Sequence, residues 1–246
     1  PKDTAFQILA MRAAVDTQQF EDALNYANAV MNNADIKKNS SIYAYYGLAL
    51  AGNKQYEQAL AQYNKALEIN KEDFKPYQYI SETYKQMGEE DKAIEYAQLY
   101  MDKNPNVAPS DYVKMAEIYN AKAQKGGDAK AANVDKAIAV YNSFAAKYPQ
   151  LKAYADLQAA NIAFQNESDD KALENYQKVI TEVENKQYDE DEKGYLMQAY
   201  KNAGYIYWSS KNDLETAKPY FEKLIRLDPN NALAKKALGL EEETAK

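Results

Sequence analysis

The residue types that most often perform enzymatic chemistry or bind metals are scarce in this sequence. Its 246 residues include no cysteine and no histidine. That absence removes disulfides, zinc sites of the Cys/His kind, thiol nucleophiles and imidazole acid–base chemistry. The 37 aspartates and glutamates remain, but choosing two of them as an acid and a base would be arbitrary without a cleft. We therefore expect a chain that is not an enzyme, with no catalytic residues, no metal and no cofactor.

Two short segments have part of the pattern of a ligand-binding loop. Residues 189–194 read Asp-Glu-Asp-Glu-Lys-Gly, with aspartate at the first and third positions and glycine at the sixth, as in a calcium loop. However, Lys193 occupies the fifth position, and Tyr200 stands where a bidentate glutamate is required. The Gly126-Gly127 pair lacks the Gly-Lys-Ser/Thr ending of a phosphate loop, so we interpret it as a turn.

The charge pattern limits the classes of partner. The 30 basic and 37 acidic residues give a net charge of −7 and are interspersed, with no basic stripe. Nucleic acid is therefore an unsuitable partner, because binding to a polyanion depends on clustered Lys and Arg. No apolar run approaches the roughly 18 residues that a membrane span requires.

Two features of the sequence, its lack of cysteine and its first residue, favour an exported protein. Lack of cysteine suits an exported bacterial protein. The chain begins at Pro1 rather than at methionine, so we expect an upstream segment: a signal peptide, a lipid anchor or further repeats. We favour a periplasmic or membrane-anchored exported protein over a cytoplasmic one.

The composition predicts that the chain folds into helices. Glycine (8) and proline (7) are scarce, and much of the apolar content comes from alanine, leucine and 23 tyrosines. An alanine followed by a bulky residue, usually with an aromatic residue four positions after the alanine, recurs every 34 to 45 residues. Its six copies begin at Ala23, Ala59, Ala93, Ala137, Ala172 and Ala217.

A second pattern precedes these alanines and completes a repeat. It reads large-x-x-large-small-x-x-large, as in Tyr43, Tyr46, Gly47 and Leu50. A small residue lets a second helix approach closely, and the later aromatic residue fills the gap between neighbouring repeats. The first and fifth copies keep this pattern only weakly, and prolines follow three of the six alanines by 12 residues, at 105, 149 and 229.

The combined pattern resembles the tetratricopeptide repeat family. The resemblance implies an all-α fold: a right-handed superhelical solenoid of six helix-turn-helix repeats with a C-terminal capping helix. We expect repeats at about 4–37, 40–73, 74–107, 109–151, 152–186 and 197–231, and the cap at 232–243.

Two intervals are long enough to contain insertions. Twenty-one positions separate Ala116 from Ala137, against 12 between Gly47 and Ala59, so we expect a longer, protruding turn around 124–128. A second insertion is expected near 185–192, between the fifth and sixth repeats, where the sequence is strongly acidic.

Most tyrosines occupy packing positions of the repeat, so binding residues must be sought elsewhere. In the family that the chain resembles, first-helix positions outside the packing pattern line the concave surface. In this register the partner-binding candidates are Arg12, Gln78, Glu82, Lys85, Glu117, Asn120, Lys201, Tyr205 and Trp208. The Lys, Asn and Arg set with which chaperone-binding members grip a terminal carboxylate is missing, because Ala44, Tyr45 and Leu48 fill that stretch of the second repeat.

These observations favour a non-catalytic scaffold for protein–protein interaction that holds a protein or peptide segment on its concave surface. Two alternatives remain open at this point. One is a structural component of a bacterial envelope assembly, and the other is a carbohydrate-binding solenoid that uses Trp208 and exposed tyrosines as stacking platforms.

Overall fold

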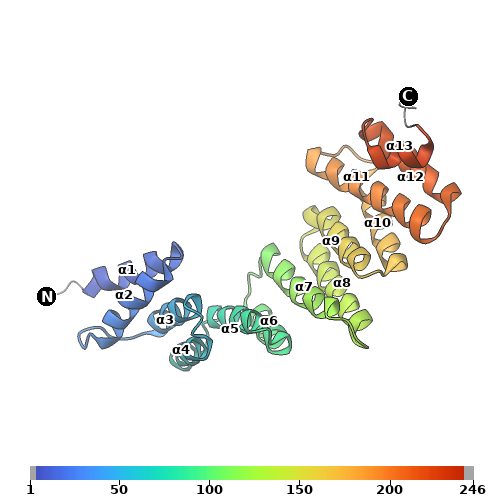
Figure 1. Ribbon diagram of the computed structural model, residues 1–246. Coiled ribbons are helices and arrows are strands. Elements are labelled where there is room, and N and C mark those ends of the chain that lie inside the picture. The colour runs from blue at the N-terminus through green and yellow to red at the C-terminus, as the bar shows by residue number, and fades with distance from the viewer. Residues whose placement is uncertain (1–3, 241–246) are drawn as a thin grey trace, which may run out of the picture. The chain divides into compact units, whose positions relative to one another are not determined.

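The computed structural model describes residues 4–240, and every regular element in that range is a helix (Figure 1). The prediction of an all-α fold is therefore confirmed. The chain forms two compact units, which we call the N-terminal unit (Pro1–Val107) and the C-terminal unit (Ala108–Lys246). None of the helices within residues 4–240 is both long and apolar enough to cross a membrane.

The N-terminal unit consists of three pairs of consecutive helices that pack against each other. These are α1 (Thr4–Asp16) with α2 (Phe20–Asn32), α3 (Ser40–Gly52) with α4 (Tyr56–Ile69), and α5 (Lys75–Met87) with α6 (Glu90–Lys103).

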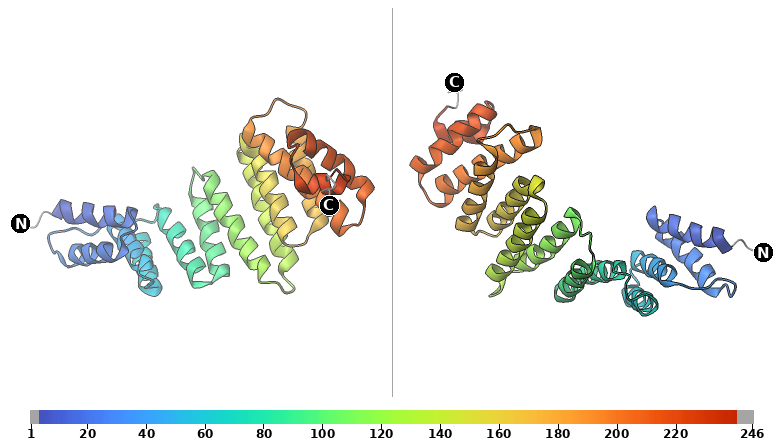
Figure 2. Two further views of the ribbon diagram at one scale, coloured as in Figure 1. Left: turned by 45° about the horizontal axis from the view of Figure 1, so that its top comes forward. Right: turned by 180° about the vertical axis from the view of Figure 1, so that it is seen from behind.

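The C-terminal unit continues the same plan, and its helix hairpins follow one another in two further views (Figure 2). The pairs are α7 (Pro109–Gln124) with α8 (Lys130–Lys147), α9 (Lys152–Gln165) with α10 (Asp169–Val183), and α11 (Glu190–Tyr205) with α12 (Leu214–Leu227). A 3-10 turn, η1 (Pro149–Leu151), precedes α9, a π-helical turn, η2 (Ile206–Ser210), follows α11, and α13 (Ala232–Leu238) packs on α12.

Close approach within a hairpin depends on a small residue that faces an aromatic ring. A Cβ atom built on Gly47 of α3 would overlap the ring of Tyr63 on α4. The equivalent atom on Gly204 of α11 would lie 3.0 Å from the ring of Phe221 on α12. Tyr63 and Phe221 are both fully buried. The large-against-small packing expected from the sequence is therefore present in both hairpins.

The first insertion lengthens helices more than it lengthens a turn. α7 has 16 residues and α8 has 18, against 13 and 14 in α3 and α4. The connection is only residues 125–129, where Gly126 and Gly127 both have positive φ. The expected protruding turn is thus mostly helix, because the alanine-rich flanking segments continue the helical pattern.

The second insertion is also helical. α11 begins at Glu190, seven residues before the expected start of the sixth repeat at 197. Asp189 caps this helix, since its side chain accepts a hydrogen bond of 2.8 Å from the backbone N–H of Glu192. The acidic segment that shares part of the pattern of a calcium loop is therefore the first turn of α11, where negative charge is favourable.

The C-terminal helix is shorter than expected. We predicted a cap over 232–243, but α13 ends at Leu238, and residues 241–243 lie outside the described range. Gly239 adopts a left-handed conformation with φ of 68°, and the N–H of Leu240 bonds back to the carbonyl of Lys235 at 2.9 Å. This arrangement is a glycine stop signal that the apolar spacing alone did not reveal.

The helix contact at Gly47 can be tested by adding one methyl group. Gly47→Ala should lower the free energy of unfolding by about 1–3 kcal/mol, because the new Cβ collides with the buried ring of Tyr63. Gly194→Ala is the matched control, since Gly194 lies inside α11 with nothing within 4 Å of an added Cβ. That variant should be stabilised by about 0.5–1 kcal/mol through helix propensity. Chemical denaturation measures the free energy of unfolding of both variants. Equal changes in the two would contradict the close approach of α3 to Tyr63 of α4.

Candidate functional site

One side of α9 remains open while the rest of the helix is buried. Much of the covered surface is alanine, as at Ala155, Ala159 and Ala163, each of which is fully buried. Small side chains let the neighbouring helices pack closely around α9. Apart from Lys152 and Phe164, the half-buried or exposed residues of α9 are spaced to lie along one side: Tyr154, Gln158, Asn161 and Gln165.

α11 presents a similar row beside this open side. Its members are Tyr195, Gln198, Asn202 and Tyr205. The two rows touch: the rings of Tyr154 and Tyr195 lie 6.1 Å apart, and the Gln198 side-chain amide donates to Asn161 Oδ1 at 3.1 Å. We call these two rows, with the adjoining side of α7, the first-helix face.

A hollow of about 560 Å³ opens on the first-helix face, where α7, α9 and α11 begin. Its volume lies in the range of roughly 300–1,000 Å³ that small-ligand pockets span. The wall is largely apolar, and its residues come from five different elements: Val113, Phe144, Leu151, Tyr154 and Tyr195.

The wall rests on a packed aromatic cluster. Phe144 is 1% exposed and stacks on Tyr112 with the ring centroids 5.6 Å apart. Tyr148 and Tyr154 meet the ring of Phe144 edge-on at 5.7 and 6.1 Å. Such contacts fix ring orientations, so this part of the wall is held in place by its own packing.

The mouth of the hollow carries polar side chains. Ser110, Lys114 and Glu117 of α7 lie at this edge. The Ser110 hydroxyl, the Lys114 ammonium and the phenols of Tyr154 and Tyr195 form no hydrogen bond or ion pair with another residue of the described range. A partner can therefore bond to them without first breaking an internal contact.

Farther along α9 and α11, the polar groups are satisfied internally. The buried Tyr176 of α10 donates to Asn161 Oδ1 at 2.9 Å and accepts from the Asn202 side chain at 2.7 Å. Burial raises the pKa of Tyr176 to about 12, an effect that the hydrogen bond from Asn202 partly opposes. This network joins three helices directly beneath the first-helix face.

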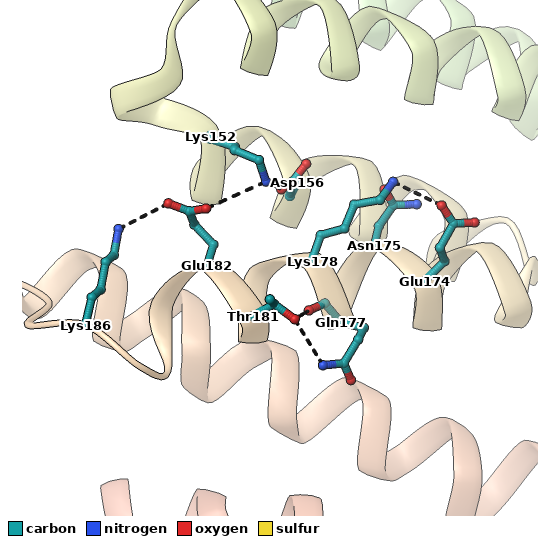
Figure 3. Close-up of polar contacts among 9 residues, drawn as sticks. All are labelled: Lys152, Asp156, Glu174, Asn175, Gln177, Lys178, Thr181, Glu182 and Lys186. Atoms are coloured by element: carbon teal, nitrogen blue, oxygen red, sulfur yellow. Dashed lines mark hydrogen bonds and ion pairs between the residues drawn. The ribbon is translucent and has the colours of Figure 1, made fainter.

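The outer side of α10 contrasts with the hollow (Figure 3). A depression of about 260 Å³ there is lined by Lys152 and by five residues of α10: Glu174, Gln177, Lys178, Thr181 and Glu182. Their polar groups bond to one another: Lys178 pairs with Glu174 at 3.1 Å, and the Gln177 amide donates to the Thr181 hydroxyl at 3.3 Å. A partner at this surface would have to displace these contacts.

Lys152 closes one end of that depression. Its ammonium lies 2.5 Å from the buried carboxylate of Asp156 and 3.9 Å from Glu182. Figure 3 labels the three side chains. A third hollow, of about 340 Å³ between α10, α11 and α12, also holds a closed pair, Lys223 with Glu184 at 2.5 Å. Within residues 4–240 no group of three or more Asp, Glu, Cys or His side chains is placed to hold a metal ion.

Comparison with known proteins agrees with the repeat geometry. Residues 40–73 and 198–231 match one form of the tetratricopeptide repeat, and residues 112–150 match another. The chain is also 33% identical over 137 residues to the photosystem I assembly protein Ycf3 of Prochlorococcus marinus subsp. pastoris, covering 52% of this chain and 78% of that protein. The chain belongs to the tetratricopeptide repeat family.

Solved tetratricopeptide repeat structures share the fold. The C-terminal part of a repeat protein from Cytophaga hutchinsonii superposes with a TM-score of 0.71 at 19% identity, covering 96% of this chain and 88% of that one. YrrB, described as having an unusual peptide-binding site, gives a TM-score of 0.51 at 18% identity, with 86% and 96% covered. At these identities the similarity concerns the fold alone.

In this tetratricopeptide repeat chain, one of the binding residues predicted for the C-terminal unit lines the hollow, and the others lie outside it. Glu117 lines the hollow. Asn120 is bonded within the first-helix face, accepting from the Asn166 side chain at 2.8 Å. Tyr205 lies edge-on to Phe164 at 6.2 Å, and Lys201 is exposed.

Trp208 lies in the π-helical turn η2 rather than in a regular helix. Its ring is half-buried and meets Phe221 edge-on at 6.0 Å. π-Helical turns are uncommon, and this one was not expected from the sequence. Trp208 therefore packs on the last hairpin and is not part of the hollow.

The predicted residues of the N-terminal unit are partly engaged in contacts of their own. Arg12 donates to the Ser41 hydroxyl at 3.0 Å and lies 5.3 Å from the centre of the Tyr45 ring. Gln78 and Lys85 are half-buried, whereas Glu82 is exposed.

Of the residues that line the hollow, only Glu117 is among the binding residues predicted from the sequence. Tyr154 and Tyr195 precede the residues that define the repeat pattern, so a register built on that pattern passes over them. A local signal was available for α11: Asp189 followed by Glu192 is a helix-start pattern, which places Tyr195 within the helix.

Tyr176 gives a test of the network beneath the first-helix face. Tyr176→Phe removes both hydrogen bonds of the hydroxyl, so the free energy of unfolding at pH 7 should fall by about 1–3 kcal/mol. The unfolded chain loses the tyrosine proton near pH 10, but the folded chain keeps it until about pH 12. The stabilising contribution of the neutral phenol is therefore complete below pH 10 and is lost between pH 10 and 12.

The variant should lose less stability than the wild type over that pH interval, by up to about 2–3 kcal/mol. Urea denaturation at several pH values measures the difference. Tyr26→Phe is a control, since that side chain is 37% exposed and its removal should change stability by less than about 0.5 kcal/mol. If the stability of the wild type and of Tyr176→Phe fell in parallel with pH, the buried, hydrogen-bonded state of the Tyr176 phenol would be contradicted.

Proposed function

We propose that this chain is a non-catalytic scaffold that binds an extended segment of a partner protein across the first-helix face of the C-terminal unit. One large apolar side chain of that segment occupies the hollow. The observation that carries the proposal is the combination of an apolar wall with polar groups at the mouth that have no internal partner.

The chemistry of the wall suits an aromatic or long aliphatic side chain. Tyr154 and Tyr195 offer ring faces and edges, while Val113 and Leu151 add aliphatic surface. Interface energy concentrates where a large side chain enters a desolvated pocket surrounded by polar contacts. The Ser110 hydroxyl and the two phenols would then bond to the backbone of the bound segment.

Relatives support this class of function. Ycf3 is named as an assembly protein of photosystem I, and the YrrB structure is described as having a peptide-binding site. One name concerns the assembly of a complex and the other the binding of a peptide, and the function proposed for this chain is of the same general class.

The remaining predicted residues extend the proposed contact. Lys201 and Tyr205 lie farther along α11 and would meet the continuation of the segment, with Trp208 beyond them. In the N-terminal unit, Arg12, Gln78, Glu82 and Lys85 are proposed as separate contacts of the same kind.

Selection of peptides from a random display library against the full chain tests the proposal. Selected peptides should bind the double variant Tyr154→Ala, Tyr195→Ala at least about tenfold more weakly, because aromatic anchors contribute more than about 1.4 kcal/mol each. The control is Gln177→Ala with Thr181→Ala on the outer side of α10, which should bind as the wild type does.

A second variant separates binding from folding. Ser110→Trp leaves the wall intact and places a ring across the mouth, since Ser110 is exposed there. It should abolish peptide binding with no loss of helix content in circular dichroism. Peptides that bind all these variants equally would place the binding surface elsewhere.

A further inference from the structure

The seven additional residues at the start of α11 give one side of the hollow a negative charge. Glu190, Asp191 and Glu192 form the first turn of this helix, after the capping Asp189. Asp191 lies one helical turn before Tyr195, on the same side of the helix. Burial and then the charge of Asp191 raise the pKa of Tyr195, so this carboxylate acts directly on the wall of the hollow.

Most of these acidic side chains already have a partner. Glu192 pairs with Lys186 at 2.8 Å, and Glu190 pairs with Lys193 at 3.3 Å. The Asp189 carboxylate is used by the helix cap. Asp191 is exposed and has no ion pair with another residue of the described range.

The two sides of the hollow's mouth differ in charge. On the α7 side, Lys114 and Glu117 line it with opposite charges. On the α11 side, Asp191 adds a carboxylate that no cation of the described residues neutralises. A cationic partner is therefore favoured on that side, and the net charge of −7 favours its approach as well.

The tyrosines of the hollow add a second attraction for a cation. Elsewhere in this chain a lysine lies over a tyrosine ring, as Lys136 does over Tyr119 at 5.7 Å and Lys223 over Tyr200 at 5.5 Å. The ring of Tyr195 has no such cation from the described residues. A guanidinium group bound to Asp191 can lie against this ring and gain the same interaction.

We infer that the partner segment of the proposed function carries a lysine or arginine next to its large apolar side chain. The apolar side chain enters the hollow between Tyr154 and Tyr195, and the cation pairs with Asp191. This inference rests on the proposed function and adds the charge of the partner to it.

Three blocked peptides test the inference on the full ¹⁵N-labelled chain: Gly-Arg-Phe-Arg-Gly, Gly-Glu-Phe-Glu-Gly and Gly-Arg-Ala-Arg-Gly. The first should shift the backbone amide signals of Val113, Tyr154 and Tyr195 in a saturable manner. The second and third should shift them at least about threefold more weakly at equal concentration, since each lacks either the cation or the apolar anchor.

Asp191→Asn should weaken binding of Gly-Arg-Phe-Arg-Gly about threefold, as expected for an exposed ion pair. Asp128→Asn is the matched control, because Asp128 is an exposed aspartate in the connection between α7 and α8, at the other end of α7. It makes the same charge change and should leave the dissociation constant unaltered. Thermal unfolding of both variants checks that the helices remain folded.

The outcomes separate the two proposals. Equal binding of the arginine and glutamate peptides at the hollow, with no effect of Asp191→Asn, would overturn the charge inference and leave the scaffold function standing. Equal binding of the phenylalanine and alanine peptides would show simple attraction to the acidic turn and would also overturn it. If no peptide moved the hollow signals, or if they moved with protein concentration alone, a peptide site there would be refuted.

Discussion

The contact between a small residue on one helix and an aromatic ring on the next sets the geometry on which the other features depend. At Gly47 the absence of a side chain leaves the space that the Tyr63 ring occupies, and Gly204 provides the same space for Phe221. Helices held this close bury the side chains that lie between them, as the fully buried Tyr63 and Phe221 show. The residues left at the first-helix face are then those that this packing only partly covers.

The hollow and the outer side of α10 differ in whether their polar side chains are paired with one another. Lysine, glutamate, glutamine and threonine on α10 satisfy one another, so water and partners gain little by binding to them. At the hollow, the Ser110 hydroxyl, the Lys114 ammonium and the two phenols have no such partner among the described residues. This difference in internal pairing is the reason for placing the proposed binding surface at the hollow and not on the outer side of α10.

Much of the fold could be predicted from the sequence, and little of the site. The alternation of small and large residues around Gly47 and Ala59 is a local pattern with a single packing solution, so the helices and their pairing followed from it. The hollow instead requires Phe144, Tyr154 and Tyr195, which are brought together from three helices. Their meeting depends on where α11 begins, and the repeat pattern contains no information about that position.

The length of α11 has a consequence for how such a chain can change its ligand. Seven residues are close to two complete turns of an α-helix, which has roughly 3.6 residues per turn. An extension of that length at the free start of a helix continues the existing rows of side chains in phase, so the interhelical contacts downstream are undisturbed. For the proposed scaffold, adding or removing whole turns at this end would therefore alter the rim of the hollow while the stacked core keeps its sequence.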